Sequence, residues 1–314
     1  MSLSTQTKKI SDLPSPKGKP ILGNLPEFKS NNKHRIFEKW SKECGDLYAI
    51  NLAGKKFIVS LDPDFNGQVL RQRPDKFSRY TKINEVFLEL GINGVFNAEG
   101  KDWMKHRKVA AEALNAKNVK KYFPVIQDKT QKLVNRIEND GERMDLQNLF
   151  MRFTIDITTE IAFGYELNTI DGNADDFQEH LEKVFPMINR RISSPFPIWR
   201  YFKSKRDKEL ENGLNIIETF INQFIDEAQE RLDNDPTLKE EPSNFLEALL
   251  VESEMEMFSK KEVFGNVFTM LLAGEDTTSN SLSWALYYLC QHPEWILKVR
   301  EEAEAIYEDK IPPN

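Results

Sequence analysis

Residues 259–291 constrain the fold more than any other stretch, because they predict one very long helix. Ser259 and Glu262 form a capping-box pattern, in which a hydroxyl and a carboxylate satisfy backbone N–H groups at the helix start. No proline follows until Pro293. Such a helix is roughly 45 Å long, the width of a whole domain. Its first half and its last part are apolar on all sides, so both are predicted to be buried.

The middle of this helix is a polar interruption. All residues from Glu275 to Ser281 are polar or charged. Two turns of polar side chains within a buried helix are unfavourable unless they face a group that can hydrogen-bond with them. This segment and the small residues before it are therefore the candidate functional site.

Four residues here carry possible chemistry. Ala273 and Thr277 share a helix face. Gly274 lacks a side chain, which allows a flat ligand to approach or the helix to widen, and Asp276 adds a titratable carboxyl. Together they could deliver protons to an oxygen species held on the helix. Equally, Thr277 could bond back to the carbonyl of Ala273 while the polar run lines a water-filled seam. The residues alone favour neither interpretation.

The rest of the chain is predicted to be mainly helical, with one small sheet near the N-terminus. A proline-rich lead-in covers residues 1–30, and runs at 47–52 and 56–61 flank a turn that predicts a hairpin. No repeat or composition shift marks a domain boundary. The other expected helices cover 34–44, 62–73, 101–114, 118–139, 146–163, 175–190 with a kink or early end at Pro186, 203–234, 244–252 and 293–308.

Charge and cysteine usage narrow the function classes. The net charge is -7 with Lys and Arg scattered, which argues against nucleic-acid binding. Cys44 and Cys290 lie far apart, so no disulfide framework is implied and a cytoplasmic location fits. The N-terminus has no apolar signal core, and no apolar run approaches the ~20 residues that span a bilayer. We expect a soluble, intracellular protein.

With its neighbours, the segment 273–278 resembles the oxygen-activation motif of the cytochromes P-450, the haem-thiolate monooxygenases: small residue, Gly, any, acid, Thr, Thr or Ser. The resemblance extends along nearly the whole chain. Matching features are the lead-in Leu13-Pro14-Ser15-Pro16-Lys17-Gly18 with Gly23-Asn24, the Gly45-Asp46 before the hairpin, the Trp-x-x-x-Arg pattern of Trp103 and Arg107, and His292-Pro293 before an acidic amphipathic helix.

The resemblance implies a role for each matched residue. Thr277 would hydrogen-bond the oxygen species bound to the haem iron, or its water, and Asp276 would relay protons to it. Ala273 and Gly274 would lie against the haem and make room for oxygen. Trp103 and Arg107 would bind a haem propionate, and an indole N–H and a guanidinium four residues apart are indeed both donors to a carboxylate. A surface cation stacked on Trp103 is their alternative.

Other aromatic and titratable residues are weaker candidates. Substrate-pocket candidates by position are Phe87, Phe96, Phe268 and Leu272, for each of which generic core is the alternative. His106 is expected to be a helix-surface histidine and not an iron ligand, because the family's ligand is a thiolate.

The resemblance also implies partners. The cofactor would be haem (iron protoporphyrin IX), with electrons from NAD(P)H through a redox partner such as a ferredoxin, a flavodoxin or a reductase. The substrates would be O2 and a hydrophobic small molecule such as a fatty acid or terpenoid, into which one oxygen atom is inserted.

The sequence departs from the family in one region. The Phe-x-x-Gly-x-Arg-x-Cys-x-Gly loop that carries the thiolate ligand and the preceding Glu-x-x-Arg helix are absent, and neither Cys44 nor Cys290 has that setting. We therefore expect residues 1–314 to be a single incomplete P-450 domain that lacks the metal ligand and is inactive by itself. The competing hypotheses are a non-catalytic helical ligand-binding or scaffolding protein on the same fold, and an unrelated helical enzyme that uses Asp276 and Thr277 without haem.

Overall fold

The structure is a computed structural model of the 314-residue chain and describes residues 9–28, 32–140, 144–172, 175–194, 196–255 and 257–307. The chain divides into two compact units, Met1–Ser78 and Arg79–Asn314. Part of the expected lead-in, at 1–8 and 29–30, and the last expected helical residue, 308, lie outside the described residues. That the two units form a single domain stays a prediction.

The first unit is built around one β-hairpin. Strands β1 (Leu47–Leu52) and β2 (Lys55–Ser60) pair antiparallel, from Leu47 opposite Ser60 to Leu52 opposite Lys55. The predicted hairpin is thus confirmed, with its second strand one residue earlier than expected. Its small core contains Trp40, Tyr48 and Ile50. The surrounding helices are η1 (Ile10–Asp12), α1 (Leu25–Phe28), α2 (Lys33–Cys44) and α3 (Pro63–Arg71).

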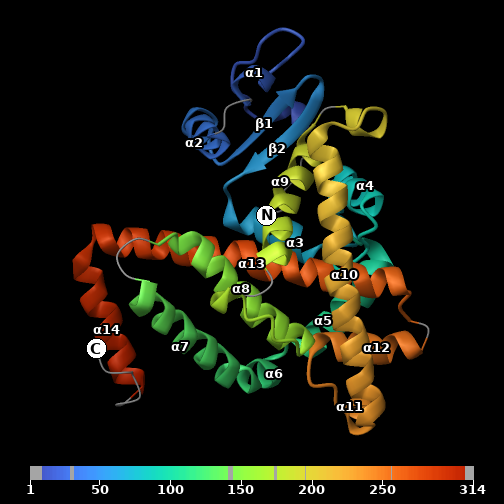
Figure 1. Ribbon diagram of the computed structural model, residues 1–314. Helices are drawn as coiled ribbons and strands as arrows, with labels where there is room; N and C mark the ends of the chain where they lie inside the picture. The colour runs from blue at the N-terminus through green and yellow to red at the C-terminus, as the bar shows by residue number, and fades with distance from the viewer. Residues whose placement is uncertain are drawn as a thin grey trace, which may run out of the picture. The chain divides into compact units, whose positions relative to one another are not determined.

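The second unit is helical throughout the residues that the structure describes, and its helices are drawn in Figure 1. They are α4 (Thr81–Glu89), α5 (Gly100–Ala113), α6 (Ala116–Lys121), α7 (Phe123–Asp140), α8 (Leu146–Phe163), η2 (Thr169–Asp171), α9 (Asp175–Ser193), η3 (Ile198–Arg200), α10 (Lys205–Asn234), α11 (Thr237–Glu240), α12 (Phe245–Glu254), α13 (Lys260–Gln291) and α14 (Pro293–Tyr307). The expectation of a mainly helical protein with a small N-terminal sheet is confirmed.

Three local expectations were wrong. Helix α4 forms in the stretch 74–98, where the pattern is weak. The single helix expected at 118–139 is two, α6 and α7. Pro186 does not end α9, which continues to Ser193. Residues on both sides of the proline, Val184 and Ile188, are buried in the unit's core, and this packing favours a continuous helix.

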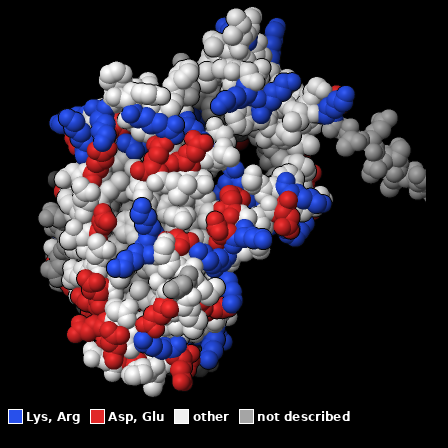
Figure 2. All heavy atoms as spheres, turned by 90° about the vertical axis from the view of Figure 1, so that its right-hand side faces the viewer, with Lys and Arg blue, Asp and Glu red and all other residues white. Residues whose placement is uncertain are grey.

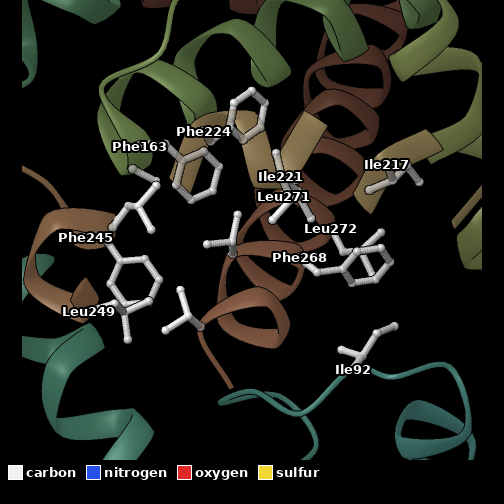
Figure 3. Packing of buried hydrophobic residues seen from close by; sticks show 14 of the residues in the cluster. Ile92, Phe163, Ile217, Ile221, Phe224, Phe245, Leu249, Phe268, Leu271 and Leu272 are labelled. Carbon is white, nitrogen blue, oxygen red and sulfur yellow. The ribbon is translucent and has the colours of Figure 1, made fainter. Parts of the chain in front are cut away.

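Helix α13 runs through the second unit, where α8 lies along it and α10 and α12 also pack on it (Figure 1). Its capping box is formed as predicted: the Ser259 hydroxyl accepts from the backbone N–H of Glu262, whose carboxylate accepts from the N–H of Ser259. Figure 3 shows Phe268, Leu271 and Leu272 of α13 among side chains of α8, α10 and α12 in the core.

The far end of α13 is not buried as its composition suggests. Trp284 is 58% exposed and Tyr288 is 57% exposed. The expectation of a helix covered at both ends was therefore wrong for its last part, where α14 leaves these aromatic side chains more than half exposed.

On the face that Figure 2 shows, charged side chains of both signs lie close to one another. Within the described ranges, no helix combines the length and the apolar character needed to cross a membrane.

Candidate active site

The polar interruption of α13 is satisfied largely by the helix itself. The hydroxyl of Thr277 donates to the carbonyl of Ala273 at 2.8 Å, and that of Ser279 donates to the carbonyl of Glu275 at 2.7 Å. Ser281 donates to the carbonyl of Thr277 at 2.7 Å. Short side chains that bond to the carbonyl four residues earlier lower the cost of polar groups inside a helix. Of the two interpretations left open by the sequence, the back-bonded one is therefore the geometry observed at Thr277.

The segment nevertheless has two different faces. Ala273 and Thr277 are exposed on one of them. On the other, Glu275 and Ser279 are buried against α8, whose Thr154 hydroxyl donates to the carbonyl of Glu275 at 3.1 Å. The exposed face carries the small residue and the hydroxyl of the expected motif, so these are the groups open to a ligand.

Gly274 serves helix packing. A Cβ added there would lie 2.2 Å from Oγ1 and 2.7 Å from Cγ2 of Thr158 on α8. Any side chain there would require Thr158 or one of the two helices to shift. Close packing on α8 therefore accounts for a glycine in this structure, and the close approach of a ligand or the widening of the helix that the sequence suggested stays a prediction.

Asp276 lies half-buried beside this packing contact. Its Oδ1 accepts a hydrogen bond of 2.7 Å from the side-chain amide of Asn280. Asn280 in turn accepts one of 3.0 Å from Gln147 on α8. The carboxyl is thus oriented by a polar chain that begins on a neighbouring helix.

The sequence interpretation missed Glu275, whose side chain is only 2% exposed. Burial, followed by the nearby charges of Glu182 and Asp276, raises its pKa to about 8. The carboxyl therefore keeps its proton at neutral pH. A signal was present, since position 275 is four residues after buried Leu271 and four before Ser279, on the face that packs inward.

Helix α5 presents the second group of candidates. Trp103 is half-buried and Arg107 is exposed. Among the described residues, Arg107 has no hydrogen-bond or ion-pair partner. Its donors are free to bind a carboxylate, as a propionate contact would need. The stacked pair suggested as the alternative is not among the cation–π contacts of the described residues.

His106 is fully buried, so the expectation of a surface histidine was wrong. The side-chain amide of Asn266 on α13 donates to its Nδ1 at 2.7 Å, which leaves the proton on Nε2. That nitrogen lies 3.6 Å from a carboxylate oxygen of Glu262. Burial, followed by the charge of Lys105, lowers the pKa of His106. The residue thus joins α5 to α13 through its contact with Asn266.

The four pocket candidates divide into core and surface. Phe87, Phe268 and Leu272 are at most 4% exposed and belong to one hydrophobic cluster. Phe96 is 37% exposed, and its ring centroid lies 5.1 Å from that of Phe87. The core interpretation describes the first three in this structure, and a role in substrate binding stays a prediction for all four.

The residues needed for a haem are present only in part. Donors at Trp103 and Arg107 fit its carboxylates, and the exposed small residue and hydroxyl of α13 fit an oxygen-binding face. Neither cysteine fits the thiolate ligand: burial and then Glu43 raise the pKa of Cys44, and Cys290 is exposed near the end of α13. Groups of three or more His, Cys, Asp or Glu side chains suited to a metal do not occur in the described part of the chain.

Comparison with known proteins identifies the protein family. The sequence profile of the cytochrome P450 family matches residues 13–314, so this chain belongs to the cytochrome P450 family. The family expected from the sequence is confirmed.

Several curated relatives match most of the chain. Cytochrome P450 94A1 of Vicia sativa is 25% identical over 94% of this chain and 60% of its own length. Protein LUTEIN DEFICIENT 5 of Arabidopsis thaliana is 24% identical over 85% of the chain and 47% of its own length. Self-sufficient cytochrome P450 monooxygenase CYP505E3 of Phanerodontia chrysosporium is 24% identical over 96% of this chain and 28% of its own length. The chain thus spans less than two thirds of the length of each of these relatives.

Proposed function

We propose that this chain is part of a haem-dependent monooxygenase and contains the residues on the oxygen-binding side of the haem. The enzyme inserts one oxygen atom from O2 into a hydrophobic small molecule. The observation that carries the proposal is the exposed face of α13, where a small residue and a hydroxyl, Ala273 and Thr277, are open to a ligand, and the half-buried Asp276 precedes Thr277 in the chain. Membership of the cytochrome P450 family supports it.

Each residue of the site has a proposed task. Arg107 and Trp103 bind the propionate of the haem, which when bound supplies the iron that activates oxygen. Ala273 leaves room on the exposed helix face, and Gly274 next to it is the second proposed haem contact. Asp276 passes protons to the Thr277 hydroxyl, which donates them outward after its bond to the carbonyl of Ala273 opens.

The proposed electron source and substrate class are those that membership of the family implies. Electrons come from NAD(P)H through a ferredoxin, a flavodoxin or a reductase. The substrate is an apolar small molecule for which Phe87, Phe96, Phe268 and Leu272 remain candidate contacts. A cytoplasmic location, inferred from the two distant cysteines, belongs to the same proposal.

One experiment separates this function from a non-catalytic role on the same fold. The coding sequence downstream of Asn314 is read, and the protein encoded by the whole frame is expressed with haem. We expect a Glu-x-x-Arg helix and a cysteine loop in frame, and a thiolate-type Soret band when the reduced protein binds carbon monoxide. A stop codon directly after Asn314, or a spectrum without that band, would favour the ligand-binding or scaffolding alternative.

The role of Thr277 has its own test in that protein. Thr277→Ala removes the proposed proton donor without touching the propionate contacts, so haem content should stay unchanged while product formed per O2 consumed falls several-fold and peroxide rises. Thr219→Ala is the matched control, because this exposed threonine of α10 also donates to the carbonyl four residues earlier and lies outside the motif. Equal coupling in Thr277→Ala and wild type would contradict proton delivery through this hydroxyl.

A further inference from the structure

A cavity of about 290 Å³ lies between α8, α9 and α13, on the buried side of the polar segment. Part of its wall is apolar and is formed by Met151, Leu181, Phe185 and Pro186. The rest is polar and includes three acidic side chains, Glu182, Glu275 and Asp276. The exposed Pro186 at its edge makes the cavity accessible from solvent.

Glu275 is the unusual member of this wall. Its side chain is 98% buried, since only 2% is exposed, and its Oε1 has no hydrogen-bond partner among the described residues. The other two acids are partnered: Glu182 accepts from Gln178 at 2.9 Å, and Asp276 accepts from Asn280 at 2.7 Å. An unpaired buried carboxyl oxygen costs free energy, so a bound donor would stabilise it.

The charges around Glu275 are all of one sign. Glu182 faces it from α9 and Asp276 lies next to it on α13, and both raise its pKa in addition to burial. The side chains that α8 brings to this place, Met151 and Thr154, are uncharged. A positive charge in the cavity would therefore meet three carboxyl groups without any competing cation among these neighbours.

We propose that this cavity binds a small organic cation, an alkylammonium or a guanidinium with a compact apolar body. The charged head donates to Glu275 and is balanced by Glu182 and Asp276. The apolar body packs on Met151, Leu181 and Phe185, since burying a small hydrocarbon against apolar side chains is favourable. This inference does not depend on the proposed oxygenase function.

Binding exchanges a proton for the cation. Glu275 carries its proton at neutral pH, so the step is uptake of one ammonium ion and loss of one proton from the carboxyl to the buffer. Charge is conserved in this exchange. Affinity should therefore rise with pH until Glu275 is ionised, by up to roughly tenfold per pH unit below 8.

The test uses benzylammonium as the probe and benzyl alcohol as its neutral counterpart. Binding to the 314-residue chain is measured by calorimetry at pH 6, 7 and 8, in two buffers that differ in ionisation enthalpy, which counts the protons released at pH 7. We expect benzylammonium to bind at least tenfold more tightly than benzyl alcohol at pH 8 and to release close to one proton at pH 7. Equal affinities, no binding of either compound, or no proton release would overturn the proposal.

Single-residue variants and the NMR signal of a cavity residue test whether the probe binds in this cavity. Glu275→Gln should weaken benzylammonium binding at least tenfold and abolish its pH dependence, while Glu138→Gln, at an exposed acid of α7, should change neither. Should Glu275→Gln lose its helical circular dichroism, Glu182→Gln replaces it and should weaken binding several-fold. The methyl resonance of Met151 should shift on titration. Wild-type affinity in the folded Glu275 variant, or an unmoved Met151 signal, would refute a site in this cavity.

Discussion

Glu275 is the residue whose environment differs most from what its neighbours in the chain suggest. In the unfolded chain its carboxyl ionises near pH ~4.3, whereas burial raises its pKa in the folded protein to about 8. The folded state thus binds one more proton between these values. The stability linked to Glu275 is complete below the lower pKa and is lost as the pH rises through the higher one.

Glu275→Gln should remove this pH dependence, because the amide has the same shape and does not ionise. We expect the variant to gain stability over wild type as the pH rises from 4.5 to 8, by up to ~5 kcal/mol. Urea unfolding at pH 5, 6.5 and 8 measures the difference. A constant offset between variant and wild type over this range would show that the buried carboxyl is not the cause.

At the scale of elements, the α8–α13 contact organises the second unit. Gly274→Ala adds a Cβ that meets Oγ1 of Thr158 at 2.2 Å. Overpacking of this kind costs about 1–3 kcal/mol and the alanine returns about 1 kcal/mol of helix propensity, so net destabilisation should be about 0–2 kcal/mol. Urea unfolding of both single variants and the double variant with Thr158→Ala should show a coupling of about 1 kcal/mol or more. Strictly additive effects would mean that the helices do not meet at this pair.

The first half of α13 makes a second close contact, with the loop before α5. A Cβ at Gly265 would lie 2.3 Å from the backbone carbonyl oxygen of Asn93, and the next residue, Asn266, accepts from the N–H of Val95 at 3.0 Å. Because backbone has to move, Gly265→Ala should cost about 3 kcal/mol, the upper end of overpacking effects. Hydrogen exchange at the Val95 amide should also accelerate. Unchanged exchange there would indicate that the loop tolerates the methyl group.

At the scale of the whole molecule, each unit has its own core. The clusters of the second unit contain residues from 79 onward only, while Trp40, Tyr48 and Ile50 form a small core in the first. A chain lacking residues 1–78 should therefore keep its helical circular dichroism and unfold in one cooperative urea transition. The isolated first unit should unfold at much lower urea, because so small a domain buries little apolar surface. A gradual transition in the shortened chain would contradict an independent core.

Much of the fold could be predicted because its signals are local. The capping box at Ser259 and the absence of proline before Pro293 predicted α13, and apolar spacing over 146–163 predicted α8 with its bounds. Helix α4 was missed because its periodicity is weak.

The site was only partly predictable, for the same reason. Ala273, Asp276 and Thr277 were found as a motif on one helix, and their place on α13 follows from helix geometry alone. The burial of Glu275 and the packing role of Gly274 were not predicted, because both depend on contacts with α8. Thr154 and Glu275, which hydrogen-bond across that contact, are 121 residues apart in the chain.

By itself, then, the sequence determined the family, the helical class and the residues of the α13 motif, since each rests on short local patterns and their order along the chain. Only the tertiary structure decided which side of α13 is open. It left Ala273 and Thr277 exposed and enclosed Glu275 between α8 and α9, because burial depends on surfaces that distant segments bring together.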